Sequence, residues 1–163
     1  MPTNTLEPLC APVEAKMTVL RGACHCGHVE AKFETSIPVE EIAVRACGCS
    51  FCRRHGAKTV ADPRGRVTFF APPDGIERYR FGLRTADYLI CRTCGVYAGA
   101  VIGAGEKLRG TLNVAGTAIE GLCDRPAQPV EYDLEDADQR RARRLAHWTP
   151  AEILLPAAQA GGG

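Results

Sequence analysis

Alternation of apolar and polar residues is the main structural signal in this sequence, and it predicts a series of short β-strands. Residues 28–34 place Val29, Ala31 and Phe33 on one side and polar or charged side chains on the other. A two-residue period of this kind is typical of a strand with one buried face. The same pattern, or a β-rich composition, predicts further strands at residues 19–24, 41–46, 66–70, 76–81, 88–91, 96–102 and 108–115.

Clusters of proline, glycine and polar residues separate these segments. Residues 62–65 (Asp-Pro-Arg-Gly) are a turn signal, and residues 71–75 break the chain a second time. A polar stretch joins the strands at 76–81 and 88–91, which are therefore predicted to pair as a hairpin. Residues 103–107 are predicted to be a flexible turn.

The end of the sequence has the composition of a helix. Between Asp133 and Trp148 acidic residues come first and arginines follow, an order that complements the helix dipole. The basic run at 140–144 is accordingly interpreted as an exposed helix end and not as a nucleic-acid patch. Thr149-Pro150 is predicted to end the helix, and the glycine-ended tail is predicted to be disordered.

Length and composition indicate one soluble globular domain. Of its 163 residues, 45% are hydrophobic and 24% are charged. A chain of this length can bury a hydrophobic core without disulfide bonds or metal ions to stabilise it. We expect a flexible tail over residues 1–17, the main β domain over 18–132, and a helix with a tail over 133–163. A net charge of +1 argues against a general nucleic-acid-binding surface. No run approaches the ~18 apolar residues of a membrane helix.

Nine cysteines form the most distinctive part of the composition. Their odd number and their Cys-x-Cys and Cys-x-x-Cys spacings suit chelation better than a disulfide framework. Free thiols belong in a reducing compartment, and the N-terminus has no apolar secretory signal. We therefore expect a cytoplasmic protein. Cys10 and Cys123 belong to none of the cysteine groups.

The densest group of thiols lies in the run 47–56, CGCSFCRRHG, of which residues 51–55 are predicted to form one helical turn. Cys47, Cys49 and Cys52 offer three ligands with no fourth in the run, which would leave one position of a tetrahedral zinc ion for water or substrate. The two arginines that follow would offset the surplus charge of three thiolates. Buried free cysteines are the alternative, but Gly, Ser and Arg are poor company in a core strand.

Two shorter cysteine knuckles stand on either side of this run. Cys24 and Cys26 follow the first predicted strand, and Cys91 and Cys94 follow the predicted hairpin. In a Cys-x-x-Cys-Gly knuckle both sulfurs can bind one ion, and Gly95 supplies the backbone angle that closes the turn. A thioredoxin-like redox pair would require a following helix, whereas the residues that follow are β-like.

The seven clustered thiols divide naturally as four plus three. The two knuckles would together complete a closed four-thiolate site that contributes to folding, and the central trio would form an open site. Spacing alone leaves other divisions open, such as Cys24 and Cys26 joining Cys47 and Cys49. Zinc suits thiolates, although iron could also occupy a four-thiolate site. His25 and His55 are weaker candidates for metal ligands. His28 is interpreted as a solvent-facing strand residue and not as a ligand.

Three stretches, GACHCGHVEAKF, CGCSFCRRHGA and YLICRTCGVYAG, resemble the glutathione-dependent formaldehyde-activating enzyme family, which includes centromere protein V. The resemblance covers roughly residues 19–125, with an extension to the WTP at Trp148. All seven clustered cysteines have a place in the family pattern, in order. One departure is Gly48, where members commonly carry histidine.

The resemblance implies a mostly antiparallel β-tent fold, in addition to the short C-terminal helix predicted above, and two zinc ions per chain. It implies a carbon–sulfur lyase activity that condenses formaldehyde with glutathione to S-hydroxymethylglutathione, or reverses that step. The residues that match the structural zinc ligands are Cys24, Cys26, Cys91 and Cys94, and those that match the catalytic zinc ligands are Cys47, Cys49 and Cys52.

Three function hypotheses follow. In the first, a thiol enters the open zinc site, loses its proton and attacks an aldehyde, while Arg53 or Arg54 binds carboxylates of a glutathione-like thiol. Tyr97 and Asn113 are further pocket candidates, although core or turn roles are favoured for both. In the second, the protein is a non-catalytic zinc module with residues 140–144 as its contact surface. In the third, Cys91 and Cys94 form a redox pair.

Overall fold

The computed structural model describes residues 15–156. Within that range the protein is mainly β, with eleven strands in one sheet, two α-helices and one 3-10 turn. The strands are β1 (Thr18–Ala23), β2 (Glu30–Thr35), β3 (Arg45–Cys47), β4 (Thr59–Val60), β5 (Arg66–Phe70), β6 (Ile76–Tyr79), β7 (Asp87–Cys91), β8 (Tyr97–Ala104), β9 (Lys107–Asn113), β10 (Gln128–Val130) and β11 (Thr149–Leu154). The helical elements are α1 (Ser50–Arg54), α2 (Ala137–His147) and the 3-10 turn η1 (Val39–Glu41).

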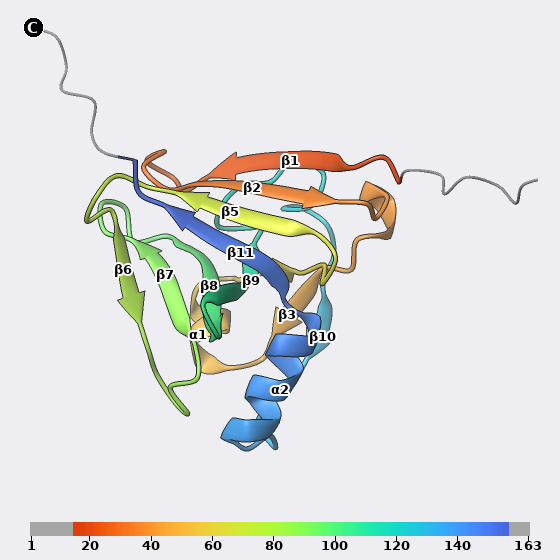
Figure 1. Cartoon of the computed structure of the whole chain (residues 1–163), viewed down its shortest axis with the longest axis vertical. Coiled ribbons are helices and arrows are strands. Elements are labelled where there is room, and N and C mark those ends of the chain that lie inside the picture. The colour runs from red at the N-terminus through yellow and green to blue at the C-terminus, as the bar shows by residue number, and fades with distance from the viewer. Residues whose placement is uncertain (1–14, 157–163) are drawn as a thin grey trace, which may run out of the picture.

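Strand β9 is the branch point of the sheet. One of its edges pairs with β8, and the other pairs with β11 and then with β4. Three arms leave it, in the orders β11-β5-β2-β1, β4-β3-β10 and β8-β7-β6. Figure 1 shows β1, β2, β5 and β11 side by side in one layer, with β6 and β7 descending from it. Among the strands of residues 15–156, only β3 with β10 and β5 with β11 pair in parallel. The predicted mainly β, largely antiparallel fold with a short C-terminal helix is therefore confirmed.

The alternating pattern that predicted the strands also explains the main core. In β2 the side chains of Ala31 and Phe33 are buried, while Glu30 is exposed. Phe33 pairs in register with Val67 of β5, and both side chains have no exposed surface. Burial of one such side chain stabilises the fold by roughly 1.5–3 kcal/mol.

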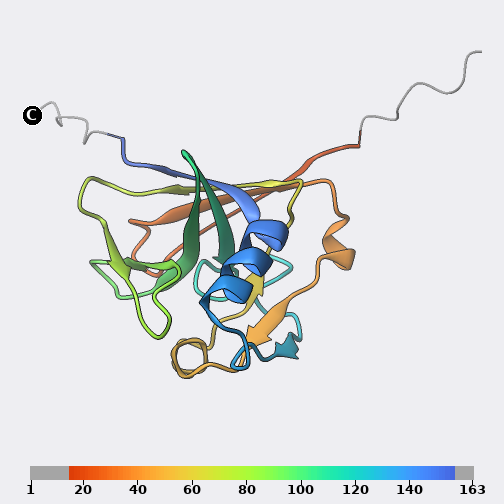
Figure 2. The same cartoon turned by 60° about the horizontal axis from the view of Figure 1, so that its bottom comes forward.

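A second, smaller hydrophobic cluster lies apart from this core. Its buried members include Cys52, Tyr97, Ala100 and Trp148, and the half-buried Cys47 packs against it. Strand β8, helix α1 and the C-cap residue of helix α2 contribute to it, and Figure 2 shows α2 alongside β8 and β9. The central cysteine run therefore lies beside an apolar environment of its own.

Most sequence-predicted elements are present, with small shifts of their ends. The hairpin of β6 and β7 pairs antiparallel as expected, and Gly105, at a φ of 67°, lies in the turn between β8 and β9. Helix α2 starts at Ala137, four residues later than the predicted Asp133, because Asp136 provides its N-cap through a capping box with Gln139.

The prediction for the chain after Trp148 is wrong in part. Residues Thr149–Leu154 form β11, which pairs in parallel with β5 and antiparallel with β9. Pro150 is accommodated near the start of this strand, where a missing amide is tolerated. Its partner strands lie about 40 and 80 residues earlier in the sequence, so the pairing cannot be predicted from a local sequence pattern.

Three further corrections are smaller. The strand predicted at 41–46 is replaced by η1 and the short β3, and β10 lies in a segment for which no strand was predicted. The predicted strand from His28 begins only at Glu30. Residues 1–14 of the expected N-terminal tail, with Cys10, lie outside the described residues, as does the chain after Pro156.

Candidate metal centres

Four thiols from two distant knuckles meet at one place. Cys24 and Cys26 lie in the turn between β1 and β2, Cys91 is the last residue of β7, and Cys94 lies in the turn between β7 and β8. Their four sulfur atoms all lie within 4.8 Å of one another. The Cys26 sulfur lies 3.6 Å from both the Cys24 and the Cys91 sulfur, and Cys91 is 65 residues away in the sequence.

Each knuckle is shaped by its own backbone hydrogen bonds. Gly27 donates its amide to the Cys24 carbonyl, and Gly95 donates to the Cys91 carbonyl. Both glycines have a positive φ, 82° and 76°, a conformation that other residues adopt only at a cost. The amide of Val29 donates to the Cys24 sulfur at 3.2 Å, which favours a thiolate there.

The donor set fits a tetrahedral thiophilic ion. Zinc–sulfur bonds of about 2.3 Å would place sulfurs about 3.8 Å apart, close to the spacing of this cluster. Four thiols without a cation cannot all ionise. Burial raises the pKa of Cys24, and desolvation and the neighbouring thiols raise that of Cys26 to about 12, against the effect of the His28 amide. Burial opposes ionisation of Cys94, but the Val96 amide and the adjacent thiols lower its pKa to about 6.

The histidines near this cluster are not among its four grouped donors. His28 is exposed and lies in the bend before β2, not within the strand as predicted. Its Nδ1 atom lies 3.2 Å from the Cys26 sulfur, so it contacts the cluster from outside. His25 is exposed in the knuckle turn.

The second cluster consists of Cys47, Cys49 and Cys52, whose sulfurs also lie within 4.8 Å of one another. Cys47 is the last residue of β3, Cys49 is the N-cap of α1, and Cys52 lies inside this helical turn. The amide of Cys52 donates to the Cys49 sulfur at 3.4 Å. The N-cap and the helical turn of α1 therefore supply two of the three sulfurs, and the end of β3 supplies the third.

Hydrogen bonds among the three thiols shift their pKa values in different directions. Thiol donation from Cys47 and Cys52 lowers the pKa of Cys49 to about 2. The same contacts raise the pKa of Cys52 well above its usual range, and the contact with Cys49 raises that of Cys47. A cation is therefore needed for all three to be thiolates, and the cluster could hold a metal ion through three protein ligands.

A cavity lies directly against the three-thiol cluster. Its volume is about 80 Å³. Cys47 and Cys52 form part of its wall, together with residues of β8, β9 and α2. The complete lining is Arg45, Cys47, Cys52, Thr59, Tyr88, Tyr97, Ala100, Thr111, Val130, Tyr132, Arg143, Arg144, His147 and Trp148.

Aromatic side chains gather beside this cavity although they are only 6% of the sequence. The Phe51 ring, on α1, lies within 5.0 Å of the Phe81, Tyr88 and Tyr97 rings, measured between centroids. Burial raises the pKa of Tyr88 to about 12 and that of Tyr97 well above its usual range. Both phenols therefore stay protonated at neutral pH and act as neutral hydrogen-bonding groups.

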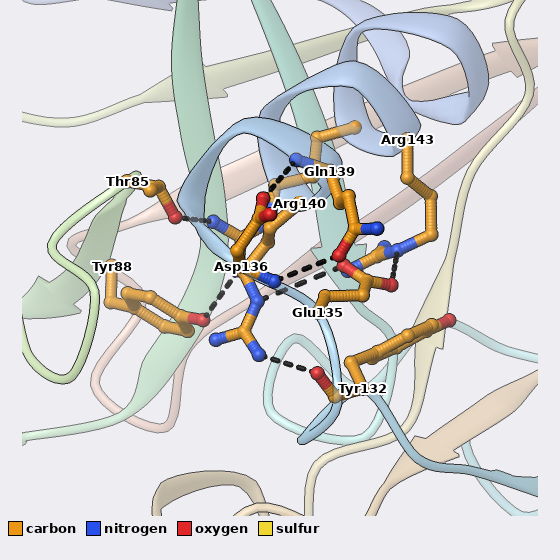
Figure 3. A network of polar contacts seen from close by, with 9 residues as sticks. Thr85, Tyr88, Tyr132, Glu135, Asp136, Gln139, Arg140 and Arg143 are labelled. Carbon is orange, nitrogen blue, oxygen red and sulfur yellow. Dashed lines mark hydrogen bonds and ion pairs between the residues drawn. The ribbon is translucent and has the colours of Figure 1, made fainter.

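The arginines of helix α2 have different surroundings, which Figure 3 shows in part. Arg143 binds the Glu135 carboxylate through two hydrogen bonds of 2.6 and 3.2 Å and lies over the Tyr132 ring. Arg144 is buried and donates instead to the hydroxyl groups of Thr85 and Tyr88. The expectation of an exposed basic helix end is therefore wrong for Arg144.

The remaining sequence-predicted site residues lie outside the cavity wall, apart from Tyr97. Arg53 and Arg54 are exposed, and neither lines the cavity. Asn113 is buried, accepts from the Lys58 amide and donates to the Tyr97 carbonyl, which is a structural role. His55 packs against the Phe51 ring, at 4.4 Å between centroids.

Gly48, between the first two thiols of the trio, faces a carboxylate. A Cβ atom at this position would lie 1.7 Å from Oε1 of Glu131. Because Gly48 has no side chain, the Glu131 carboxylate lies beside the three-thiol run, and this proximity is absent from any local sequence pattern.

The described fold and clusters define a mainly β protein with two cysteine groups that could hold metal ions. No protein-family model matches the sequence. Among solved structures, the chain is similar to a Rhodobacter sphaeroides protein whose crystal structure was a structural-genomics target. The identity is 32% over 68% of this chain and 99% of that chain, with a TM-score of 0.50. The chain belongs to the same family as that protein, whose description names no activity. No helix within residues 15–156 is long and apolar enough to cross a membrane.

Proposed function

We propose that this protein is a zinc-dependent carbon–sulfur lyase of the glutathione-dependent formaldehyde-activating type. The observation that carries the proposal is the three-thiol cluster at the wall of a cavity, separate from a complete four-thiol cluster. A closed set of four thiolates is typical of a structural zinc ion, and three protein ligands leave a position for substrate. The predicted cytoplasmic location is part of the same proposal, because such thiols require a reducing compartment.

The proposed reaction joins a glutathione-like thiol to a formaldehyde-like aldehyde. When bound, zinc would lower the pKa of a thiol that enters the open position. The thiol gives up its proton, its sulfur forms a bond to the aldehyde carbon, and the carbonyl oxygen takes up a proton. The product is a hemithioacetal, and the reverse step breaks the same carbon–sulfur bond. No electrons are gained or lost overall, so no oxidant or reductant is required.

The residues of the chain would bind and orient the reactants. Cys47, Cys49 and Cys52 would hold the ion on the cavity wall. Tyr97 and Tyr88, whose raised pKa values keep them protonated, would act as neutral hydrogen-bonding groups at the cavity wall. The buried apolar surroundings of Cys52 exclude bulk water, which strengthens electrostatic interactions with a developing charge.

A test compares two single-thiol variants, Cys49→Ala and Cys123→Ala, under the same conditions. Cys123 is a half-buried thiol that lies in neither cluster and is therefore a matched control. Glutathione and formaldehyde are mixed with zinc-loaded protein, and thiol consumption is followed against a protein-free blank. We expect Cys49→Ala to lose more than roughly 100-fold of the catalysed rate while Cys123→Ala keeps it.

Circular dichroism and metal content accompany these rates. Both variants should keep the β-sheet spectrum, and Cys49→Ala should lose about one ion per chain while Cys123→Ala loses none. Full turnover by Cys49→Ala, or a wild-type rate equal to the blank, would contradict the proposed function.

A further inference from the structure

Arg144 is a buried cation without a counterion in the described part of the chain. Only 6% of its surface is exposed, and none of the ion pairs within residues 15–156 involves it. Desolvation lowers its pKa, but a guanidinium stays charged in proteins. A charge in this position costs free energy unless an opposite charge is brought to it.

The hydrogen bonds of Arg144 leave part of its guanidinium unused. One terminal nitrogen donates to the Thr85 hydroxyl at 2.6 Å and the other to the Tyr88 hydroxyl at 3.2 Å. The Nε atom is buried and has no hydrogen-bond partner. Figure 3 shows Thr85 and Tyr88 on one side of helix α2, with Glu135 and Tyr132 on the other. Neutral partners therefore hold the Arg144 guanidinium in a fixed orientation, and its Nε–H group has no acceptor.

The cavity that Arg144 lines is basic and contains no acidic side chain. Its lining includes Arg45, Arg143, Arg144 and His147, and no aspartate or glutamate. Arg143 is neutralised by Glu135, whereas Arg45 has no hydrogen bond or ion pair from its side chain within residues 15–156. Within residues 15–156, Arg45 and Arg144 of the cavity wall therefore have no carboxylate partner, and they share this cavity with Cys47 and Cys52.

We infer that Arg144 forms an anion-binding subsite, which binds a carboxylate of the thiol that enters the three-thiol centre. This inference rests on the proposed function and narrows its substrate to thiols that also carry a carboxylate. A guanidinium pairs with a carboxylate through parallel charge-assisted hydrogen bonds, for which Nε and a terminal nitrogen are the natural donors. The bound carboxylate would supply the missing counterion and the missing hydrogen-bond partner together.

The exposed arginines next to the thiols are a less suitable alternative. Arg53 and Arg54 are adjacent in sequence to Cys52, but they do not line the cavity and their charges are screened by solvent. Arg144 is desolvated and oriented before the ligand arrives, so little of its interaction with an anion is lost to ordering.

The only tryptophan of the chain reports directly on this subsite. The Arg144 guanidinium carbon lies 4.8 Å from the centre of the Trp148 ring. A carboxylate that binds Arg144 should therefore change the emission of Trp148. This signal requires neither turnover nor a thiol, so it is independent of lyase activity.

The experiment titrates metal-loaded protein with three probes of similar size at pH 7.5. The probes are 3-mercaptopropionate, its methyl ester, and propionate. They offer a thiol with a carboxylate, the same thiol without the charge, and the carboxylate alone. We expect all carboxylates to shift Trp148 emission, and 3-mercaptopropionate to bind about 10- to 100-fold more tightly than its ester, as charge-assisted hydrogen bonds predict.

Arg144→Met is compared with Arg53→Met as the matched control. Arg144→Met should bring the preference for 3-mercaptopropionate over its ester to about one-fold, while Arg53→Met keeps it. Arg144→Lys retains the charge without the paired donors and should keep only part of the preference. Metal content and the circular dichroism spectrum verify that each variant is folded.

The outcomes separate the two proposals. An equal affinity of the wild type for acid and ester, or an unchanged preference in a folded Arg144→Met, overturns the subsite, whatever the lyase activity. The wild-type comparison of acid and ester still decides the matter if Arg144→Met does not fold. Propionate binding at Trp148 with no added affinity from the thiol supports the subsite and contradicts the open-site lyase.

Discussion

Close backbone contacts at single glycines shape the sheet that carries the metal centres. A Cβ atom on Gly22, at the end of β1, would lie 2.0 Å from the Thr117 carbonyl oxygen and 2.8 Å from Cδ1 of Ile119. Thr117 and Ile119 are both fully buried, so neither can shift easily to make room for a methyl group. Gly103, on β8, has no atom within 4 Å of the same position and no positive φ.

We therefore expect Gly22→Ala to lower the free energy of unfolding by about 1–3 kcal/mol, the usual cost of overpacking. Gly103→Ala is the control, and its effect should stay within about 0.5 kcal/mol. Urea unfolding of both variants measures the difference. Equal stability of the two variants would show that the chain around Thr117 adapts to the added methyl group.

The residues around Arg144 explain why its burial was not predicted from the sequence. Its sequence surroundings, four arginines within five positions, are typical of a solvent-exposed helix face. Its partners Thr85 and Tyr88 are 59 and 56 residues away, so burial of this one arginine could not be read from its neighbours.

At the scale of elements, an ion pair holds the end of the β6–β7 hairpin that lies away from the four-thiol centre. Asp87 opens β7, whose last residue is the ligand candidate Cys91. Its carboxylate accepts from Arg78 at 3.1 Å and from Arg80. Partial burial opposes ionisation, but the two arginines prevail and lower the pKa of Asp87 below its ordinary value.

This depressed pKa sets the pH dependence of one contribution to stability. The contribution of Asp87 should be complete above its unfolded pKa of about 3.9 and be lost as the pH falls through its lower folded value. Because the arginines are half exposed, we expect Asp87→Asn to cost less than about 1 kcal/mol at pH 7. Urea unfolding of wild type and variant from pH 7 to pH 3 measures the difference.

Glu77→Gln serves as the control for the hairpin. Glu77 pairs with Arg92 at 2.8 Å, but both side chains are more than half exposed, so a smaller effect is expected. A cost of Asp87→Asn that grows as the pH falls below 4 would contradict the assigned sign.

At the scale of the whole molecule, the two metal centres differ in what they connect. The four-thiol centre joins the β1–β2 turn to the β7–β8 turn, which are on different arms of the sheet. The three-thiol centre draws on one short segment, β3 and α1. Closing a long loop through a metal stabilises the fold more than closing a short one.

A chelator should therefore remove metal in two steps. The ion at the open three-ligand centre should leave first with the β-sheet intact, and the second ion should leave slowly, together with loss of structure. A chromophoric chelator and circular dichroism followed in parallel measure both steps. Cys49→Ala should lack the first step, and release of both ions without loss of structure would show that the four-thiol centre is not structural.

Local geometry determined much of what could be predicted. Thiols two or three residues apart must lie close together in any turn, so the knuckles at Cys24 and Cys91 and the trio around Cys49 were predictable from spacing. Alternation likewise predicted β2, and β-rich segments between turn signals predicted β5 and the β6–β7 hairpin. The mainly β class followed from these segments, because each has only one face to bury.

The tertiary structure alone decided which knuckles share an ion, because spacing permitted several divisions and the sheet places the Cys26 sulfur 3.6 Å from that of Cys91. It also decided that Thr149–Leu154 is a strand and that Arg144 and Trp148 line the cavity of the trio. The physical reason is distance along the chain. A contact within a turn is enforced by covalent geometry, whereas a contact across 40 to 100 residues depends on the register and branching of the whole sheet.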